Sequence, residues 1–304
     1  MSNFLMLAIC LAAGLVLRRS GRAPHDAHLA INAVIIHVSL PAVTLRYLHG
    51  FHFSANQLLP VLMPWILFAL GAVLFGTLGR WLALPRRSVG ALTLVGGLGN
   101  TSFVGLPMIE SLYGREGMGL GLLIDQLGSY LVLSTAGMVA VAVYTTEGHA
   151  SVLAVARKVA TFPPFIALAA ALALTPISFP PAVDGALARI GETLAPLALL
   201  SVGMQLRFDA LLRNARLLGL GLGYKLLLCP AMVIALIWLH NAHPVMASHV
   251  SVIEAAMPPM IGAGIVATQA GLDPPLVSAM IGIGIPLGLL TAEAWHQLFG
   301  WAVA

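Results

Sequence analysis

The stretch GALTLVGGLGNTSFVGLP, residues 90–107, decides the fold. It is apolar enough to lie inside a membrane, yet twelve consecutive residues hold Gly96, Gly97, Gly99, Asn100, Gly105 and Pro107. Glycine costs about 1 kcal/mol and proline about 3 kcal/mol in a helix interior, so we predict that a helix breaks here. A break inside a bilayer is viable only where it faces protein or a water-filled cavity. The stretch therefore predicts a cavity-lining site within a membrane protein.

The composition of the whole chain indicates the same setting. Of 304 residues, 59% are hydrophobic and only 9% are charged, whereas soluble domains carry about 25% charged residues. This excludes a soluble enzyme, a nucleic-acid-binding protein and a disordered scaffold, and it makes the lipid bilayer the expected partner. Cys10 and Cys229 both lie in apolar runs, so the sequence offers no disulfide framework.

Charge-free intervals predict an all-α integral membrane protein with ten spans, because one span needs about 20 apolar residues. The predicted spans are 3–17, 28–48, 58–80, 89–112, 118–144, 159–175, 186–206, 217–239, 247–270 and 275–299.

The basic residues orient these spans. Eleven of the fifteen fall on one predicted face: Arg18, Arg19, Arg22, Arg80, Arg86, Arg87, Arg157, Lys158, Arg207, Arg213 and Arg216. Cytoplasmic loops carry the excess of Lys and Arg, so we predict that this face is cytoplasmic. Both termini of the multi-pass protein are then extracytoplasmic, with the cell membrane as the expected location.

Ten spans divide into two sets of five, residues 1–148 and 149–304, that run in opposite directions because five is odd. This predicts an inverted repeat. The second set contains a matching break in its fourth span, where Glu254 precedes Met257, Pro258 and Pro259. Opposed half-helix ends at two such breaks would offer positive ends to an anion and free carbonyl groups to a cation.

The motif GNTSFVGLP at 99–107 resembles the auxin efflux carrier family of secondary transporters. Further matches are LPAVTL at 40–45, LAPLALLSVGMQL at 194–206, KLLLCPAM at 225–232 and EAAMPPMIGAGIVATQAGLDPPLVSAMIGIGIPLGLLT at 254–291. The resemblance implies two inverted five-helix repeats with crossing broken helices four and nine, as in sodium/bile-acid symporter relatives. It also implies a homodimer in which a transport domain, mixing both repeats, moves against a scaffold domain in an elevator mechanism.

Members of that family carry organic anions, such as indole-acetate or dicarboxylates. Matched by motif, the substrate-binding residues would be Asn100, Thr101, Gly105 and Pro107 on one side of the crossing, and Met257, Pro258 and Pro259 on the other.

Two acidic residues are the candidates for ion coupling. Glu254 lies one turn before the Pro258 break, and an intramembrane acid must pair, take up a proton or bind a cation. The alternative is a neutral, hydrogen-bonded core carboxyl. Asp125 could bind Na⁺ together with Gln126 and Thr101, or carry a proton; its structural alternative is to cap the amides freed by the break.

The other polar residues carry competing interpretations. Lys225 either snorkels toward the cytoplasmic surface or pairs with an acid, and snorkelling is the favoured reading. Arg46 is an interfacial anchor or, less favourably, an anion ligand. The pairs His240 with His243 and His49 with His52 are read as solvated loop histidines, because a zinc site usually needs a third protein ligand. No metal other than a possible Na⁺ at Glu254 is expected.

No nucleotide-binding or hydrolase motif is present, so the predicted function needs an ion gradient and no cofactor beyond Na⁺ or H⁺. We therefore predict a non-enzymatic secondary active transporter of an organic anion. The alternative is a channel or an intramembrane enzyme that uses the same broken helices.

Overall fold

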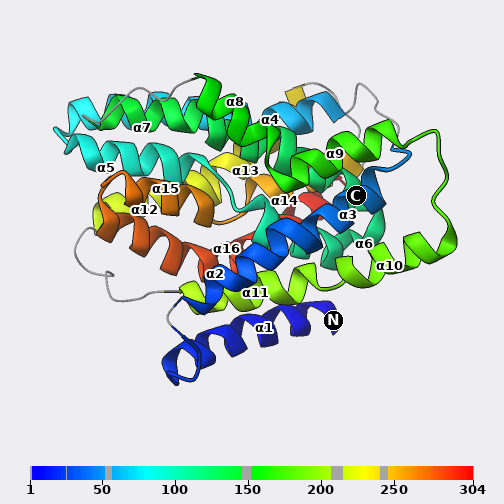
Figure 1. The fold of residues 1–304 in the computed structure, drawn as a ribbon. Helices are drawn as coiled ribbons and strands as arrows, with labels where there is room; N and C mark the ends of the chain where they lie inside the picture. The colour runs from blue at the N-terminus through cyan, green and yellow to red at the C-terminus, as the bar shows by residue number, and fades with distance from the viewer. Residues whose placement is uncertain are drawn as a thin grey trace. The chain divides into compact units, whose positions relative to one another are not determined.

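The computed structural model describes residues 2–24, 26–51, 57–145, 152–206, 215–239 and 246–303 (Figure 1). Over these ranges the chain is helical between short connections, and its one strand-like contact is an isolated antiparallel bridge between Gly99 and Pro259. The predicted all-α class is confirmed. Five residues discussed above lie outside the described ranges: His52, Arg207, Arg213, His240 and His243.

The helices of the described residues have these bounds: α1 (Ser2–Arg19), α2 (Ala27–Val34), α3 (Leu40–Leu48), α4 (Leu58–Trp81), α5 (Arg86–Ala91), α6 (Leu106–Leu123), α7 (Met138–Tyr144), α8 (Val152–Ala160), α9 (Pro163–Ala173), α10 (Pro181–Gly191), α11 (Leu194–Gln205), α12 (Ala215–Gly223), α13 (Cys229–Leu239), α14 (Met246–Ala255), α15 (Ile261–Gln269) and α16 (Pro274–Val303). Wider π-helical turns occupy Ile35–Ser39, Leu92–Gly96, Thr101–Gly105, Ile124–Tyr130, Leu133–Gly137 and Tyr224–Leu228. Such turns are frequent at functional sites.

Six helical stretches of the described chain are long and apolar enough to cross a membrane: Ala27–Leu48, Leu58–Trp81, Thr101–Tyr144, Pro181–Gln205, Ala215–Leu239 and Pro274–Gly300. This supports a membrane protein built from helices. The predicted spans 89–112 and 247–270 are each interrupted, and α9 is shorter than a full span. The count of ten spans stays a prediction.

Two boundaries differ from the predicted spans. The span predicted at 159–175 is divided, because α8 ends at Ala160 and α9 begins at Pro163. Phe162 adopts an extended backbone, as expected for a residue that precedes proline. The connection predicted between 112 and 118 is a sharp kink at Gly114, whose φ of 60° and ψ of −146° suit glycine alone.

Contacts divide the chain into two compact units, and each takes segments from both halves of the sequence. Unit 1 comprises Met1–Ser54, Ser102–Leu122 and Ala156–Leu206, and unit 2 comprises Ala55–Thr101, Leu123–Val155 and Arg207–Ala304.

In unit 1, α1 packs against α11, and the two helices lie side by side (Figure 1). The two helices meet at Gly14 and Gly203. A Cβ atom on Gly14 would lie 2.1 Å from the carbonyl oxygen of Leu200, and one on Gly203 would lie 2.1 Å from that of Leu11. Small residues allow helix backbones to approach closely in membranes, so these glycines fix the packing of α1 on α11.

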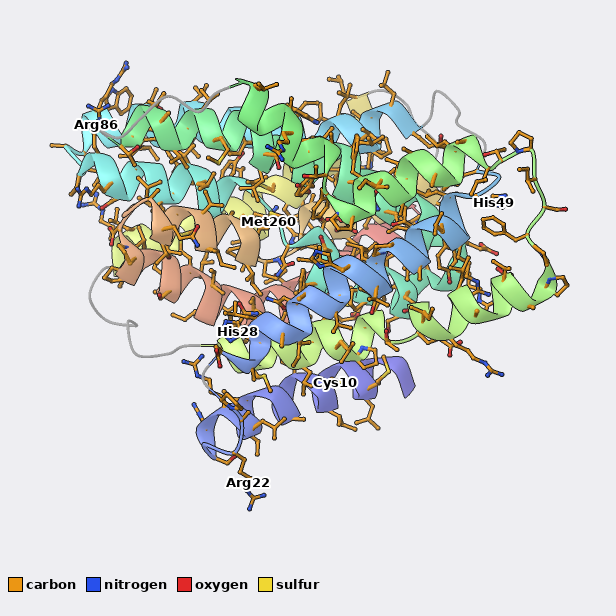
Figure 2. The ribbon with its side chains drawn as sticks, in the orientation of Figure 1. Cys10, Arg22, His28, His49, Arg86 and Met260 are labelled. Atoms are coloured by element: carbon orange, nitrogen blue, oxygen red, sulfur yellow. The ribbon has the colours of Figure 1, made fainter. Side chains whose placement is uncertain are left out.

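Hydrogen bonds between helices stabilise unit 2. Ser88 donates a hydrogen bond to Asp273 Oδ2 at 2.6 Å, while Asp273 Oδ1 accepts from the amide of Leu276 at 3.3 Å. Asp273 thereby caps the start of α16 and ties it to α5. Arg86, labelled in Figure 2, lies at the start of α5. Its guanidinium donates to the carbonyl of Val143 in α7 at 2.5 Å.

Candidate functional site

The two helix breaks of unit 2 meet each other. The first leaves residues 98–100 outside helical structure, between the π-helical segments Leu92–Gly96 and Thr101–Gly105, and the second separates α14 from α15. The amide of Asn100 donates to the carbonyl of Pro258 at 2.8 Å, and the amide of Met260 donates to the carbonyl of Leu98 at 3.0 Å. This reciprocal pairing satisfies backbone groups that the breaks remove from their helices, as a buried break requires.

Residue types at the crossing explain why it forms. Pro258 and Pro259 have no amide hydrogen, so interrupting the helix there leaves fewer donors without partners. They also pack closely on α16: a Cβ atom on Gly288 would lie 2.7 Å from Pro258 Cβ, and one on Gly284 would lie 2.7 Å from Pro259 Cδ. Glycine on α16 and proline at the break are therefore complementary in shape. Met257, in the same break, is fully buried.

Glu254 is the last residue but one of α14 and is 1% exposed. Neither of its carboxylate oxygens accepts a hydrogen bond from the described part of the chain. A carboxylate at a helix C-terminus also faces the negative end of the helix dipole. Buried polar groups are almost always satisfied, so this carboxylate requires a partner such as a cation, a proton or water.

Lys225 lies in the π-helical segment Tyr224–Leu228 and is 2% exposed. Its ammonium donates to the carbonyl of Ala255, the last residue of α14, at 2.9 Å. The favoured prediction that Lys225 snorkels to the surface is therefore wrong. The side chain instead places a positive charge at the negative end of α14, where a cation is stabilising.

Asp125 and Thr101 are brought together by the structure. The hydroxyl of Thr101, the first residue after the break, donates to Asp125 Oδ1 at 2.6 Å in a buried contact. Asp125 and its neighbour Gln126 are 1% and 0% exposed in the segment Ile124–Tyr130, which packs on α4. Asp125 and Lys225 lie near enough to Glu254 to interact with it electrostatically.

A small cavity lies beside Glu254, Lys225 and Thr101. It leaves about 10 Å³ for the centre of a water molecule, which is room for about one water or one monatomic ion. Glu254, Lys225 and Thr101 are the residues of its lining introduced above. The lining is completed by three residues of α4, three residues at the first break and one residue of the segment Ile124–Tyr130: Met63, Pro64, Leu67, Gly97, Leu98, Gly99 and Ser129.

Sequence reasoning missed the contribution of α4 and of Ser129. One signal was present: Pro64 is a proline inside the apolar run that forms α4. A Cβ atom on Gly128 would lie 2.7 Å from Pro64 Cγ, so these two residues set the close packing of α4 on the Asp125 segment. Proline and glycine inside predicted spans therefore mark helix contacts as well as breaks.

Other predicted residues are placed elsewhere. Gly105 ends the π-helical segment after the break and Pro107 lies in the first turn of α6, and both belong to unit 1. Arg46 is also in unit 1, where its Nε pairs with Asp184 Oδ1 at 3.2 Å. His49 contacts the carbonyls of Leu174 and Ile177 at 3.0 and 2.8 Å through Nε2, so it holds the loop after α9 and is not simply solvated.

Known proteins are similar in sequence to this chain along nearly its whole length. A family model described as "Membrane transport protein" matches residues 1–296. The chain belongs to this family. It is the auxin efflux carrier family, so the resemblance predicted from GNTSFVGLP is confirmed.

Two archaeal relatives carry only general names. An uncharacterized transporter of Methanothermobacter thermautotrophicus is 26% identical over 296 residues, which cover 96% of this chain and 95% of the relative. An uncharacterized transporter of Methanocaldococcus jannaschii is 24% identical over 281 residues, covering 89% and 88%. Family and relatives indicate a membrane transporter.

Proposed function

We propose that the protein is a secondary active transporter that moves an organic anion, a carboxylate, in exchange for or together with Na⁺ or H⁺. The observation that carries this proposal is the environment of Glu254. Its carboxylate is buried, accepts no hydrogen bond from the described residues, and lines a cavity at the crossing of two broken helices. An ionisable group in that setting is typical of ion pathways in membrane proteins.

The charges around the cavity favour one coupling cation. With every group in its ordinary ionised form, the carboxylates of Glu254 and Asp125 outnumber the ammonium of Lys225 by one. One monovalent cation would neutralise the cluster. Na⁺ would bind Glu254 with the hydroxyl of Thr101 and with backbone or side-chain oxygens, Gln126 included, whereas H⁺ would bind a carboxylate directly.

The anion is proposed to bind at the helix N-termini that begin after each break. One begins at Thr101 and the other, α15, at Ile261, and helix N-termini attract anions. Asn100, Met257, Pro258 and Pro259 would line that position, with Gly105 and Pro107 shaping the helix that follows Thr101. The cavity has room for about one water, so admitting a carboxylic acid requires the helices to move. This requirement fits alternating access.

The architecture we propose has ten spans in two inverted repeats, residues 1–148 and 149–304, with both termini extracytoplasmic in the cell membrane. Both breaks belong to unit 2, which is the candidate for the moving domain of an elevator mechanism. Unit 1, with its close contact of α1 and α11, is the candidate scaffold and homodimer surface.

Uptake by proteoliposomes tests the proposal. Vesicles containing the purified protein would receive radiolabelled dicarboxylates or indole-acetate, with Na⁺ and pH gradients imposed separately. We expect saturable accumulation under one of the two gradients and counterflow when unlabelled anion is inside. Absence of accumulation and exchange under both gradients contradicts the proposal. Conductance far above transporter turnover would indicate a channel, and chemical conversion of the label an intramembrane enzyme.

A further inference from the structure

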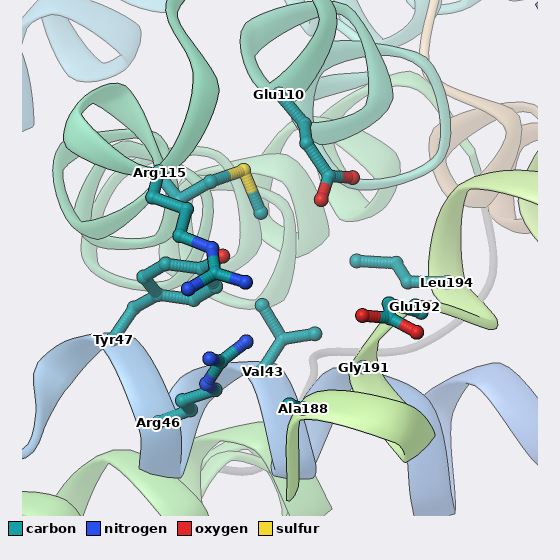
Figure 3. Close-up of a pocket in the computed structure, with 10 residues that line it drawn as sticks. Val43, Arg46, Tyr47, Glu110, Arg115, Ala188, Gly191, Glu192 and Leu194 are labelled. Carbon is teal, nitrogen blue, oxygen red and sulfur yellow. The ribbon is translucent and has the colours of Figure 1, made fainter. Parts of the chain in front are cut away.

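A second pocket lies within unit 1, and it is independent of the helix crossing. It is formed by α3, by α6 on both sides of the Gly114 kink, and by the connection from α10 to α11 (Figure 3). Its empty volume, including the solvent at its open mouth, is about 360 Å³. Charged and apolar side chains share its lining: Val43, Arg46, Tyr47, Glu110, Arg115, Met118, Ala188, Gly191, Glu192 and Leu194.

The charges of this pocket are separated by sign. Figure 3 shows the guanidinium groups of Arg46 and Arg115 together beside Tyr47, and the carboxylates of Glu110 and Glu192 across the hollow from them. Arg46 forms an ion pair with Asp184 at 3.2 Å. In the described part of the chain, no ion pair within 4.0 Å joins Arg115, Glu110 or Glu192 to any residue. The two sides therefore face one another without closing into salt bridges.

Local backbone features build this separation. Glu110 and Arg115 stand on either side of the kink at Gly114, whose positive φ turns the chain sharply. Glu192 lies in the short interruption between α10 and α11, directly after the last residue of α10. The charges are therefore displayed from three separate chain segments.

Electrostatic complementarity selects one class of ligand. A simple anion would meet two carboxylates, and a simple cation would meet two guanidinium groups. A molecule with an anionic oxygen group and an ammonium a few bonds apart satisfies both sides. We propose that this pocket binds a small zwitterion, its anionic end on Arg46 and Arg115 and its primary ammonium on Glu110 and Glu192.

The volume of the pocket limits the zwitterion to a small molecule. The pocket leaves about 30 Å³ for the centre of a water molecule, which corresponds to about two or three waters. Val43, Met118 and Leu194 contribute apolar surface to its lining. This suits a glycine-sized free amino acid, or the ethanolamine phosphate headgroup of a lipid, which carries the same pair of charged groups.

Binding by calorimetry tests the proposal on the purified full-length protein in lipid-free detergent. Glycine would be compared with acetate, which lacks the ammonium, and with methylamine, which lacks the carboxylate. We expect saturable glycine binding and no binding of either analogue. Arg115→Gln and Glu192→Gln, both at exposed positions that tolerate the change, should each weaken glycine binding on the order of tenfold or more, as expected for a lost charge-assisted contact.

Matched controls are available in the same unit. Glu116→Gln and Arg189→Gln alter exposed charges that do not line the pocket, and they should leave binding unchanged. In nanodiscs, stabilisation by phosphatidylethanolamine over phosphatidylcholine that disappears in Glu192→Gln would identify the lipid headgroup as the source. The proposal is overturned if acetate binds as tightly as glycine. It is also overturned if the protein responds neither to glycine nor to phosphatidylethanolamine.

Discussion

The ammonium of Lys225 donates a hydrogen bond of 2.9 Å to the carbonyl oxygen of Ala255, the residue at which α14 ends. The lysine is thus a built-in cation at the negative end of a broken helix, beside the carboxylate of Glu254. A buried ammonium and a buried carboxylate around one small cavity form a cluster whose charge changes when an ion enters.

Replacing Lys225 tests the electrostatic role of its ammonium. Lys225→Met keeps the length of the side chain but leaves the Ala255 carbonyl without its donor and removes the positive charge near Glu254. Loss of a buried hydrogen-bond donor typically costs about 1–3 kcal/mol, so we expect a fall in thermal stability together with loss of uptake. Thermal unfolding in detergent and proteoliposome uptake measure the two effects. Unchanged stability and uptake would show that the ammonium contributes neither.

Gly99→Ala separates function from folding at the same site. A Cβ atom there would lie 3.0 Å from Lys225 Nζ and 3.4 Å from the Glu254 carbonyl oxygen. The ammonium is the end of a flexible chain and can shift by a few tenths of an ångström, so we expect a stability change of about 1 kcal/mol or less and a several-fold loss of uptake. Gly223→Ala in α12 is the matched control, because nothing lies within 4 Å of its Cβ position. Equal uptake by the two variants would contradict the expectation.

Thr101→Val removes the hydroxyl that donates to Asp125 while keeping the shape of the side chain. Loss of a buried donor costs about 1–3 kcal/mol, and we expect weaker binding of the coupling ion as well. Thr101→Ser retains the hydroxyl and should restore most of the activity. The measurement is uptake as a function of Na⁺ concentration and of pH. If the valine and serine variants behave alike, the hydrogen bond to Asp125 has no functional role.

Gly203→Ala tests the packing of unit 1. The added Cβ would lie 2.1 Å from the Leu11 carbonyl oxygen, which is backbone and cannot turn aside. Overpacking of this kind costs about 1–3 kcal/mol or more, so the variant should unfold at a lower temperature. Gly185→Ala in α10 of the same unit has open space around its Cβ position and serves as the control. Identical melting curves for the two would rule out a tight contact of α1 with α11.

The sequence was informative where local chemistry determines structure. Glycines 96, 97 and 99 and the pair Pro258 and Pro259 cannot continue a helix cheaply, so the positions of both breaks follow from residue type. The predicted helical class follows from the apolar composition, because charge-free intervals of about 20 residues predict membrane-spanning helices. The pairing of Asn100 with Pro258 required the structure, because hydrogen bonds between distant segments depend on packing that no local pattern encodes.

Lys225 is the clearest case in which the sequence alone did not predict the position of a side chain. Its place about two turns from the predicted cytoplasmic end of its span made snorkelling plausible. The side chain instead donates to the carbonyl at the end of α14, 30 residues later in the chain. The pocket of unit 1 escaped prediction for a related reason. Glu110, Arg115 and Glu192 belong to no motif, and only the fold brings them near Arg46.

Ion-driven uptake by the Glu254→Gln variant tests the central claim most directly. The amide keeps the size of the side chain but can neither carry a proton nor supply a charged ligand to Na⁺. In proteoliposomes with separately imposed Na⁺ and pH gradients, we predict that this variant loses gradient-driven accumulation of the anion, while Glu116→Gln, at an exposed position, transports like the unaltered protein. Full gradient-driven uptake by Glu254→Gln would contradict the assignment of Glu254 as the coupling residue.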